Sequence, residues 1–479
     1  MSVLVSSTFN LLSPASSASV QAGGPGDPGG LRLERAMGLR RSFQRAILRW
    51  RVSPLPDNTP PPSRILLSEG TSLSAREAVT SLGRSGRKVE ICAPAPLCFA
   101  GYSKWVRRVH VVPALGADPG GYVRAVADLC VREPIDVLLP VHEQAYLFAA
   151  LRHRDRDWPS PHTSVPVAPL AAYEAVQTKS ALAATLAAAG LPQPATFVAR
   201  TPEELLNHGT TLLRADGACI VKANAGTASV GLERVRDQPH LEKLCAAFAA
   251  AAAPVEPAVV QQLVVGPLER IEAVFFQGTM TAVHCSRQLI EGPGGGDVLK
   301  ESVSRPASVA HLQLIGERLR WNGALAFDYL LESGNPDRPR YIDANPRLVE
   351  PLSAHLSGAN LTDALIRVAR GEAPGPLAIG RPGVRTRLGI PGLLERAIAT
   401  GRRRTVVADF ANQVLAHGRY QGSVEELTPY QDDVRSAIPL LGVLASLLVK
   451  PASAPHITRA TVESYALGPR GHAYIRALT

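Results

Sequence analysis

The stretch from Gly323 to Arg347 constrains the fold more than any other part of this chain. Two apolar runs enclose a segment rich in turn-forming residues, and this order predicts a β-hairpin. Side chains alternate between the two faces of a strand, so Asp343 and Asn345 share a face of the second strand, opposite Asp328 on the first. We therefore expect side-chain oxygen atoms from both strands to meet across the hairpin.

A carboxylate within an apolar strand is unfavourable unless a partner compensates its charge. A hard divalent cation such as Mg²⁺ prefers oxygen ligands and is one such partner. The alternative interpretation is that Asp328 and Asp343 lie at a solvated sheet edge. Asn345 and Arg347 follow at fixed spacing, and this pattern favours the metal site.

The length and composition predict a globular protein with about three domains among its 479 residues. A net charge of +10 is compatible with nucleic acid, membrane surfaces or anionic metabolites as partners. Most basic residues are arginines scattered along the chain without a nucleic-acid-binding motif, so we expect no nucleic-acid partner. The six cysteines include no Cys-x-x-Cys pair, and we expect buried thiols rather than zinc ligands or disulfides.

No apolar run reaches the length of a transmembrane helix. The closest, Ala437–Val449, predicts a packing helix, and an interfacial helix stays open as an alternative because Arg402, Arg403 and Arg404 precede it. The N-terminus lacks the basic start and continuous apolar stretch of a secretory signal. We therefore expect a cytoplasmic protein.

Changes in pattern along the chain predict four segments. Residues 1–62 are rich in Ser, Ala, Gly and Pro and predict an extension, with a basic helix near 31–50. Residues 63–170 alternate short apolar strands with helices, which predicts a parallel α/β domain. Residues 171–375 contain the hairpin and the lysine motifs described below, and residues 376–479 predict a C-terminal module without an assignable role.

Several individual elements follow from local patterns. In the α/β domain, Ser74 and Glu77 have the spacing of a helix capping box. Ligands of open parallel sheets lie beyond the carboxyl ends of the strands, which makes Glu69, Gly70, His142 and Glu143 candidates for substrate contact, although ordinary loop residues are the simpler interpretation. The other expected elements are strands at 65–67, 89–92, 135–140, 219–223 and 259–266, a hairpin turn at Gln277-Gly278, helices at 122–130, 178–189, 308–321 and 361–370, and a short strand at Thr405–Ala408.

Two lysines have surroundings that suit a phosphate. Lys179 lies in the first turn of its helix, where the helix dipole disfavours a cation unless an anion binds there. Lys222 ends a strand and precedes the loop 224–231, whose small residues let backbone N–H groups approach a phosphate closely. The alternatives are a solvated lysine and an ordinary hairpin loop. The two signals together favour nucleotide binding.

This succession resembles the ATP-grasp superfamily, which includes biotin carboxylase, carbamoyl-phosphate synthetase, D-alanine ligase and many carboxylate-amine ligases. The resemblance covers roughly residues 64–371. It implies a protein of mixed α/β and α+β class, with a parallel α/β domain before the ATP-grasp domain and ATP between two antiparallel sheets. It also implies ATP and Mg²⁺ or Mn²⁺ as cofactors, and it leaves the oligomeric state open, a homodimer included.

The resemblance also implies roles for individual residues. Arg347 and Arg287 would be catalytic, and Asp328, Asp343 and Asn345 would bind metal. The nucleotide would be bound by Lys179, Lys222, Gly226, Ser229, Gly231, Gln262 and Glu272. The chain departs from the family at two points: Asp stands at both metal carboxylates where Glu is common, and Gln262 replaces an acid near the ribose.

The function implied by this resemblance is that of an ATP- and Mg²⁺-dependent ligase. It would activate a small carboxylate as an acyl phosphate, release ADP and join the acyl group to an amine. One alternative is phosphorylation of bicarbonate, as in a carboxylase or a carbamoyl-phosphate synthetase. Another is a nucleotide-binding regulatory protein without turnover. The sequence does not identify the carboxylate or the amine.

Overall fold

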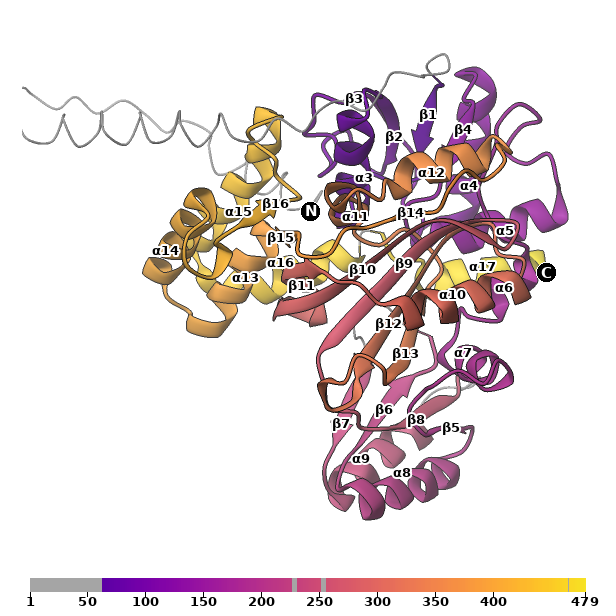
Figure 1. Cartoon of the computed structure of the whole chain (residues 1–479), viewed down its shortest axis with the longest axis vertical. Helices are drawn as coiled ribbons and strands as arrows, with labels where there is room; N and C mark the ends of the chain where they lie inside the picture. Colours follow the sequence, from indigo (N-terminus) through magenta and orange to yellow (C-terminus); the bar gives the residue numbers. More distant parts are fainter. Residues whose placement is uncertain (1–62, 226–230, 251–255, 464) are drawn as a thin grey trace, which may run out of the picture. The chain divides into compact units, whose positions relative to one another are not determined.

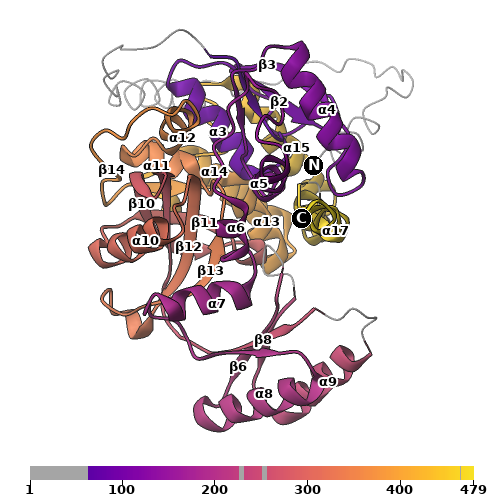
Figure 2. The same cartoon turned by 90° about the vertical axis from the view of Figure 1, so that its right-hand side faces the viewer.

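The structure is a computed structural model that describes residues 63–479, apart from 226–230, 251–255 and residue 464. The predicted N-terminal extension and its basic helix therefore lie outside the described residues. The described chain belongs to one compact unit and contains three β-sheets. Figure 1 shows how the elements are arranged, and Figure 2 gives the perpendicular view.

The N-terminal sheet has four parallel strands in the order β3-β2-β1-β4. Its strands are β1 (Ile65–Leu67), β2 (Val89–Ala93), β3 (Val106–Val111) and β4 (Val137–Leu139). Its helices are α3 (Leu73–Arg84), α4 (Pro119–Arg132) and α5 (Gln144–Arg154), with α6 (Leu170–Glu174) following. The predicted parallel α/β fold is confirmed, while the domain bounds 63–170 remain a prediction. Strand β3 was not predicted because two exposed arginines interrupt its apolar residues.

The predicted capping box at the start of α3 is wrong. The helix is capped by Ser72, whose hydroxyl accepts a hydrogen bond from the backbone N–H of Ala75 at 3.0 Å. Glu77 is fully buried and accepts from the backbone N–H of Leu352 at 3.3 Å. A long-range contact, which no local pattern encodes, therefore determines the position of this carboxylate.

The smallest antiparallel sheet has the strand order β5-β8-β6-β7. Figure 2 shows α8 and α9 on one side of it and α7 on the other. The elements are α7 (Lys179–Ala188), β5 (Thr196–Ala199), α8 (Pro202–Asp216), β6 (Cys219–Ala223), β7 (Leu232–Val235), α9 (Gln238–Ala249) and β8 (Ala258–Gln262). The predicted strand from Val259 is confirmed, but it ends at Gln262 rather than at Gly266.

The largest sheet follows the order β13-β12-β9-β10-β11-β15-β16, with β14 paired to β10. Five of its strands are β9 (Leu268–Phe276), β10 (Thr279–Glu291), β11 (Asp297–Ser302), β12 (Gly323–Leu331) and the edge strand β13 (Pro339–Asn345). The predicted hairpin is confirmed as β12–β13. The predicted turn between β9 and β10 is also confirmed: Gln277 and Gly278 both have positive φ, 49° and 95°.

Three helices accompany this sheet: α10 (Pro306–Arg318), α11 (Pro351–Ser357) and α12 (Leu361–Ala369). They pack against its strands or against α3. Buried residues of β9, β10 and β12 form a continuous apolar core with residues of α10 and α7, with Trp321 and Tyr329 among its largest members. This core holds the two strands of the hairpin in a fixed register.

The C-terminal residues extend the large sheet. Strands β14 (Ala378–Ile379), β15 (Arg385–Arg387) and β16 (Ser423–Glu425) join it, while the predicted domain boundary at residue 375 remains a prediction. The helices here are α13 (Gly389–Thr400), α14 (Arg403–Leu415), α15 (Ala437–Val449), α16 (Ala454–Glu463) and α17 (Gly468–Leu478).

One C-terminal prediction is wrong and another is confirmed. The expected strand at Thr405–Ala408 lies inside α14, because burial of Val406 in the core that α13 and α15 share outweighs the strand preference of β-branched residues. The apolar helix Ala437–Val449 is α15. Among the described residues no single helix is long and apolar enough to span a membrane, and one bent pair of helices, 434–449 with 451–459, passes that test by length and composition.

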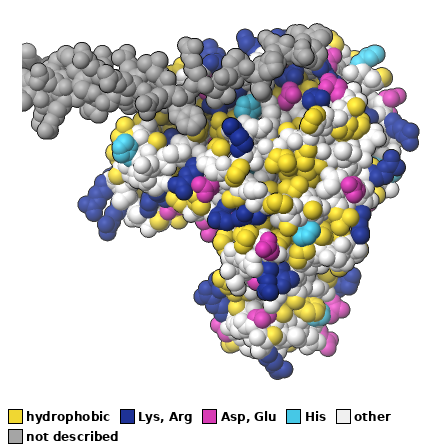
Figure 3. Space-filling view, viewed as in Figure 1, with side chains coloured by type: hydrophobic (Ala, Val, Ile, Leu, Met, Phe, Trp, Pro, Cys, Tyr) yellow, Lys and Arg dark blue, Asp and Glu magenta, His cyan; other side chains and the backbone are white. Residues whose placement is uncertain are grey.

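Basic side chains are spread over one face of the molecule, and the cysteines are buried, as expected from their distribution in the sequence. Figure 3 shows Lys and Arg side chains spread over the visible face, with acidic and apolar side chains between them. All six cysteines are free thiols in buried positions, as the sequence predicted.

Candidate nucleotide and metal site

Lys179 is the first residue of α7, and Thr178 caps this helix by accepting from the backbone N–H of Ala181 at 3.2 Å. The Nζ atom of Lys179 lies 3.5 Å from Oδ1 of Asp343 on β13. Asn224, at the start of the predicted phosphate loop, accepts from the backbone N–H groups of Lys179 and Ser180 at 2.9 and 3.0 Å. These bonds tie the loop to the N-terminus of the helix.

Lys222 is buried at the end of β6, with 6% of its surface exposed. Its Nζ donates to Oε1 of Gln261 at 2.8 Å and to the carbonyl oxygen of Ile342 at 3.4 Å. Burial lowers the pKa of Lys222 to about 8, although the negative charge of Asp343 opposes this shift. An anion beside this ammonium group would stabilise its charged form.

The two lysines and strand β13 enclose one pocket. Separate regions of the chain therefore meet there: α7, the segment before β5, the end of β6, strand β8 and the second strand of the hairpin. The pocket is lined by Lys179, Leu182, Ala183, Leu186, Gln193, Lys222, Val259, Gln261, Tyr341 and Ile342.

The hairpin places the predicted metal ligands together. Asp328 lies directly opposite Asp343 in the β12–β13 ladder, and Ala326 lies opposite Asn345. The Nδ2 atom of Asn345 donates to Oδ2 of Asp328 at 3.1 Å, and Nη2 of Arg347 donates to Oδ1 of Asn345 at 3.0 Å. Burial lowers the pKa of Arg347. The predicted catalytic arginine is thus in direct contact with the predicted ligand set.

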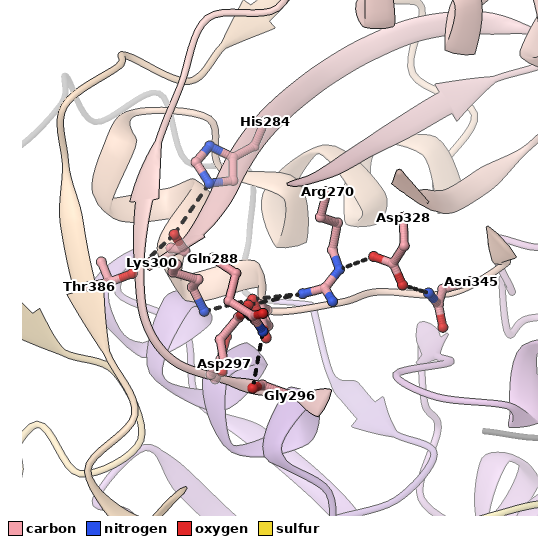
Figure 4. A network of polar contacts seen from close by, with 12 residues as sticks. Arg270, His284, Gln288, Gly296, Asp297, Lys300, Asp328, Asn345 and Thr386 are labelled. Atoms are coloured by element: carbon pink, nitrogen blue, oxygen red, sulfur yellow. Dashed lines mark hydrogen bonds and ion pairs between the residues drawn. The ribbon is translucent and has the colours of Figure 1, made fainter. Parts of the chain in front are cut away.

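Beside the hairpin lies a carboxylate-rich cluster that sequence reasoning missed, and Figure 4 shows part of it. Arg270 on β9 contacts Asp328, Asp297 and Glu350 at 2.6, 3.3 and 3.0 Å. Lys300 on β11 contacts Glu350 at 2.7 Å and Glu426 at 3.0 Å. These residues are far apart in the sequence, and the sheet register brings them together.

Two further acids border this cluster, Glu77 on α3 and Glu272 on β9. Burial raises the pKa of both carboxyl groups well above the ordinary value, and neighbouring acids add to the effect. The Oε2 atom of Glu272 has no hydrogen-bond partner among the described residues. Burial also acts to lower the pKa of Lys300, but Glu350 and Glu426 outweigh it and raise that pKa.

No family model matches the chain, and no curated protein matches it by sequence. Solved structures match by fold. The biotin carboxylase domain of the Hydrogenobacter thermophilus 2-oxoglutarate carboxylase, in complex with MgADP, ADP and bicarbonate, aligns with a TM-score of 0.53 and 14% identity, over 67% of this chain and 73% of that one.

Two further structures give similar values. The biotin carboxylase of Campylobacter jejuni has a TM-score of 0.51 and 17% identity, over 65% of this chain and 72% of that one. The N5-carboxyaminoimidazole synthetase of Staphylococcus aureus, complexed with ADP, has a TM-score of 0.52 and 12% identity, over 69% and 83%. The chain has an ATP-grasp fold. At these identities the likeness establishes the fold alone, and roles within it rest on this chain's own residues.

Within the ATP-grasp fold, the remaining predicted residues fall in different places. Gly226 and Ser229 lie outside the described residues, whereas Gly231 has φ of 73° and its carbonyl accepts from the N–H of Ala223 at 2.9 Å. Gln262 ends β8 and bonds the backbone of Ala195. The assignment of these residues to nucleotide binding stays a prediction.

Two predicted residues lie away from the lysine pocket. Glu272 is not among the residues that line that pocket and belongs to the carboxylate cluster. Arg287 on β10 contacts Glu269 at 2.8 Å, and Arg305 binds the same carboxylate. Both assignments, nucleotide binding by Glu272 and a catalytic role for Arg287, also stay predictions.

Two candidate substrate contacts of the α/β domain, Glu69 and Glu143, have hydrogen-bond partners within the protein. Glu69 accepts from Thr71 and Ser72 within its own loop. Glu143 accepts from the backbone N–H of Leu467 at 2.7 Å, which ties the C-terminal segment to this edge of the sheet. The ring of His142 is buried, and burial lowers its pKa well below the ordinary value.

The hairpin donors suit a hard divalent cation. Asp328 and Asp343 are side by side, and 37% of the Asp343 side chain is exposed; a metal bound there would have to displace the contact of Asp343 with Lys179. Over the described part of the chain, no group of three or more His, Cys, Asp or Glu could hold a metal ion. A metal site at the hairpin would therefore need Asn345 or the nucleotide itself to complete its ligands.

Proposed function

We propose that this protein is an ATP- and Mg²⁺-dependent ligase that activates a small carboxylate as an acyl phosphate and couples it to an amine. The observation that carries the proposal is the convergence of both lysines on β13. Lys179 reaches Asp343, and Lys222 reaches the carbonyl of Ile342, in a chain with an ATP-grasp fold. Cationic and acidic groups that meet in this way suit the polyphosphate of a metal-bound nucleotide.

The proposed chemistry has two steps. A carboxylate oxygen attacks the γ-phosphorus of ATP, the bond to the bridging oxygen breaks, and ADP leaves. The amine nitrogen then attacks the acyl carbon, phosphate leaves, and the nitrogen gives up a proton. Lys179 and Lys222 would bind phosphate oxygens, and Arg347 would stabilise charge that develops during transfer. Mg²⁺ held by Asp328, Asp343 and Asn345 would supply further positive charge there.

This set of residues needs no covalent nucleophile. Positioning and electrostatic stabilisation account for most of the catalysis of phosphoryl transfer. Exclusion of water would protect the acyl phosphate from hydrolysis until the amine arrives. The bond of Arg347 to Asn345 supports the role proposed for this arginine, because it holds the guanidinium beside a proposed metal ligand.

Trapping of the acyl phosphate tests the proposal. The full chain is incubated with ATP, Mg²⁺, hydroxylamine and a panel of small carboxylates and amino acids. A productive carboxylate should give ADP and a hydroxamate in equal amounts. The Asp343→Asn variant should lose both products together, because one negative metal ligand is replaced at similar volume. The exposed Lys243→Ala variant on α9 serves as the matched control.

Other products would contradict the proposal. Release of AMP and pyrophosphate would mean that the carboxylate is adenylated. ADP without hydroxamate, dependent on bicarbonate, would favour phosphorylation of bicarbonate instead. Nucleotide binding without ADP release for any substrate would favour a regulatory protein.

A further inference from the structure

Arg270 is enclosed by three carboxylates that come from three different parts of the chain. Its Nε lies 2.6 Å from Oδ1 of Asp328, and its Nη1 lies 3.3 Å from Asp297 and 3.0 Å from Glu350. The arginine side chain is 13% exposed, and the three acids are 5–17% exposed. Such a group of buried negative charges requires a cation in its midst.

The position of Arg270 is fixed by the backbone as well as by charge. Arg270 on β9 lies directly opposite Asp328 on β12, in a ladder that continues without a register shift from residue 323 to residue 330. An arginine guanidinium stays protonated in proteins, so Arg270 is a permanent cation at this point of the sheet.

The contacts of the hairpin side chains show which carboxylate oxygen Arg270 makes unavailable to a metal. Oδ1 of Asp328 accepts a hydrogen bond from Arg270, whereas Oδ2 accepts one from the side-chain amide of Asn345. Asp343 has no described contact with Arg270, and its side chain is more exposed than that of Asp328, 37% against 17%. The two sides of the donor set thus differ: Asp343 has a longer, more exposed contact with the ammonium of Lys179 at 3.5 Å, whereas Arg270 is held against Asp328 at 2.6 Å in a more buried position. A divalent cation would displace the first contact more easily than the second.

We propose that Arg270 takes the place of a second divalent cation, so that the nucleotide complex holds a single metal ion, bound on the Asp343 side of the hairpin. This inference rests on the proposed function, since it concerns the same site. A second divalent ion on the Arg270 side of Asp328 would face the guanidinium at close range, and the repulsion of like charges would oppose its binding. Because the guanidinium of Arg270 is part of the chain, its positive charge is present without the entropy cost of immobilising a free ion.

A count of bound metal tests this proposal independently of turnover. The full chain is saturated with a non-hydrolysable ATP analogue and titrated with Mn²⁺, and free Mn²⁺ is measured by electron paramagnetic resonance. The wild type should bind about one Mn²⁺ per chain, and Arg270→Gln should bind about one more, because Asp328, Asp297 and Glu350 regain free oxygens. Arg385→Gln is the matched control, since Arg385 also pairs with a cross-strand carboxylate, Glu301, in the same sheet but is half-exposed.

The Arg270→Gln variant leaves three carboxylates without their cation and can fail to fold. The double variant Arg270→Gln/Asp297→Asn removes one charge of each sign and should gain the second Mn²⁺ as well. Two ions per chain in the wild type would overturn the inference and leave the proposed function intact. One ion in folded Arg270 variants would also overturn it. No Mn²⁺ bound to any folded form would overturn both proposals.

Discussion

The pocket beside Lys222 and the cluster around Lys300 contain similar buried ammonium groups in opposite surroundings. Lys222 donates to two neutral oxygens, from Gln261 and Ile342, and burial lowers its pKa. Lys300 contacts two carboxylates, Glu350 and Glu426, and they raise its pKa. The charge of Lys300 is thus compensated within the protein, whereas the hydrogen-bond partners of Lys222 are neutral, which agrees with the proposal that an external anion binds there.

The largest expected effect comes from removing the ammonium group that compensates the charges of Glu350 and Glu426. Lys300→Met leaves Glu350 and Glu426 buried without their ammonium partner, and it should lower the free energy of unfolding by about 3–5 kcal/mol. Urea denaturation at pH 7 measures this change, with exposed Lys243→Met as control. The loss should be smaller at pH 5, because protonation removes the uncompensated charge. An unchanged stability would mean that the acids are already neutral in the wild type.

The residues that could be predicted from the sequence differ from those of the cluster in that local patterns indicate them. The hairpin from Gly323 to Arg347 was predicted because its apolar runs and its turn lie within one short stretch, and Asp328 and Asp343 do face each other. Lys179 and Lys222 were identified from the helix start and the strand end, both of which are local features.

The partners of these residues were not predictable in this way. Arg270 and Glu426 belong to stretches without a local motif. The strand order of the large sheet brings Arg270 and Lys300 into one cluster, in which Glu426 contacts Lys300. The same physical reason explains the two wrong local predictions. Glu77 has the spacing of a capping box but bonds α11, and Val406 has a strand preference but packs in a helical core.

Removal of Lys222 should affect nucleotide binding more than stability, in contrast to removal of Lys300. Lys222→Ala removes a charged donor from the proposed phosphate site, and it should weaken binding of an ATP analogue by about 10–100-fold. Its effect on unfolding should be much smaller than that of Lys300→Met, because no carboxylate loses a contact partner. Calorimetric titration measures the affinity, and exposed Lys243→Ala should bind like the wild type. Unchanged affinity of Lys222→Ala would remove this lysine from the site.

The smallest effect, and the most specific, is on pH dependence. The pKa of Lys222 in the free protein is about 8, below that of an ordinary lysine, because burial disfavours the charged form. Above this pH the free protein must take up a proton to restore the ammonium group for a phosphate. Affinity for an ATP analogue should therefore fall as pH rises, by at most about tenfold between pH 8 and pH 9.

Stability of the free protein should respond to the same group in the opposite sense. Between about pH 8 and pH 10.4 the unfolded chain keeps its proton on Lys222 while the folded chain has lost it, so the contribution of this lysine to stability rises with pH. In Lys222→Ala both trends should flatten, whereas Lys300→Met should retain them, because the raised pKa of Lys300 places its own titration at higher pH. A wild-type affinity that stays constant from pH 7 to pH 9 would mean that Lys222 is already charged and compensated, and the distinction between the two lysines would then be lost.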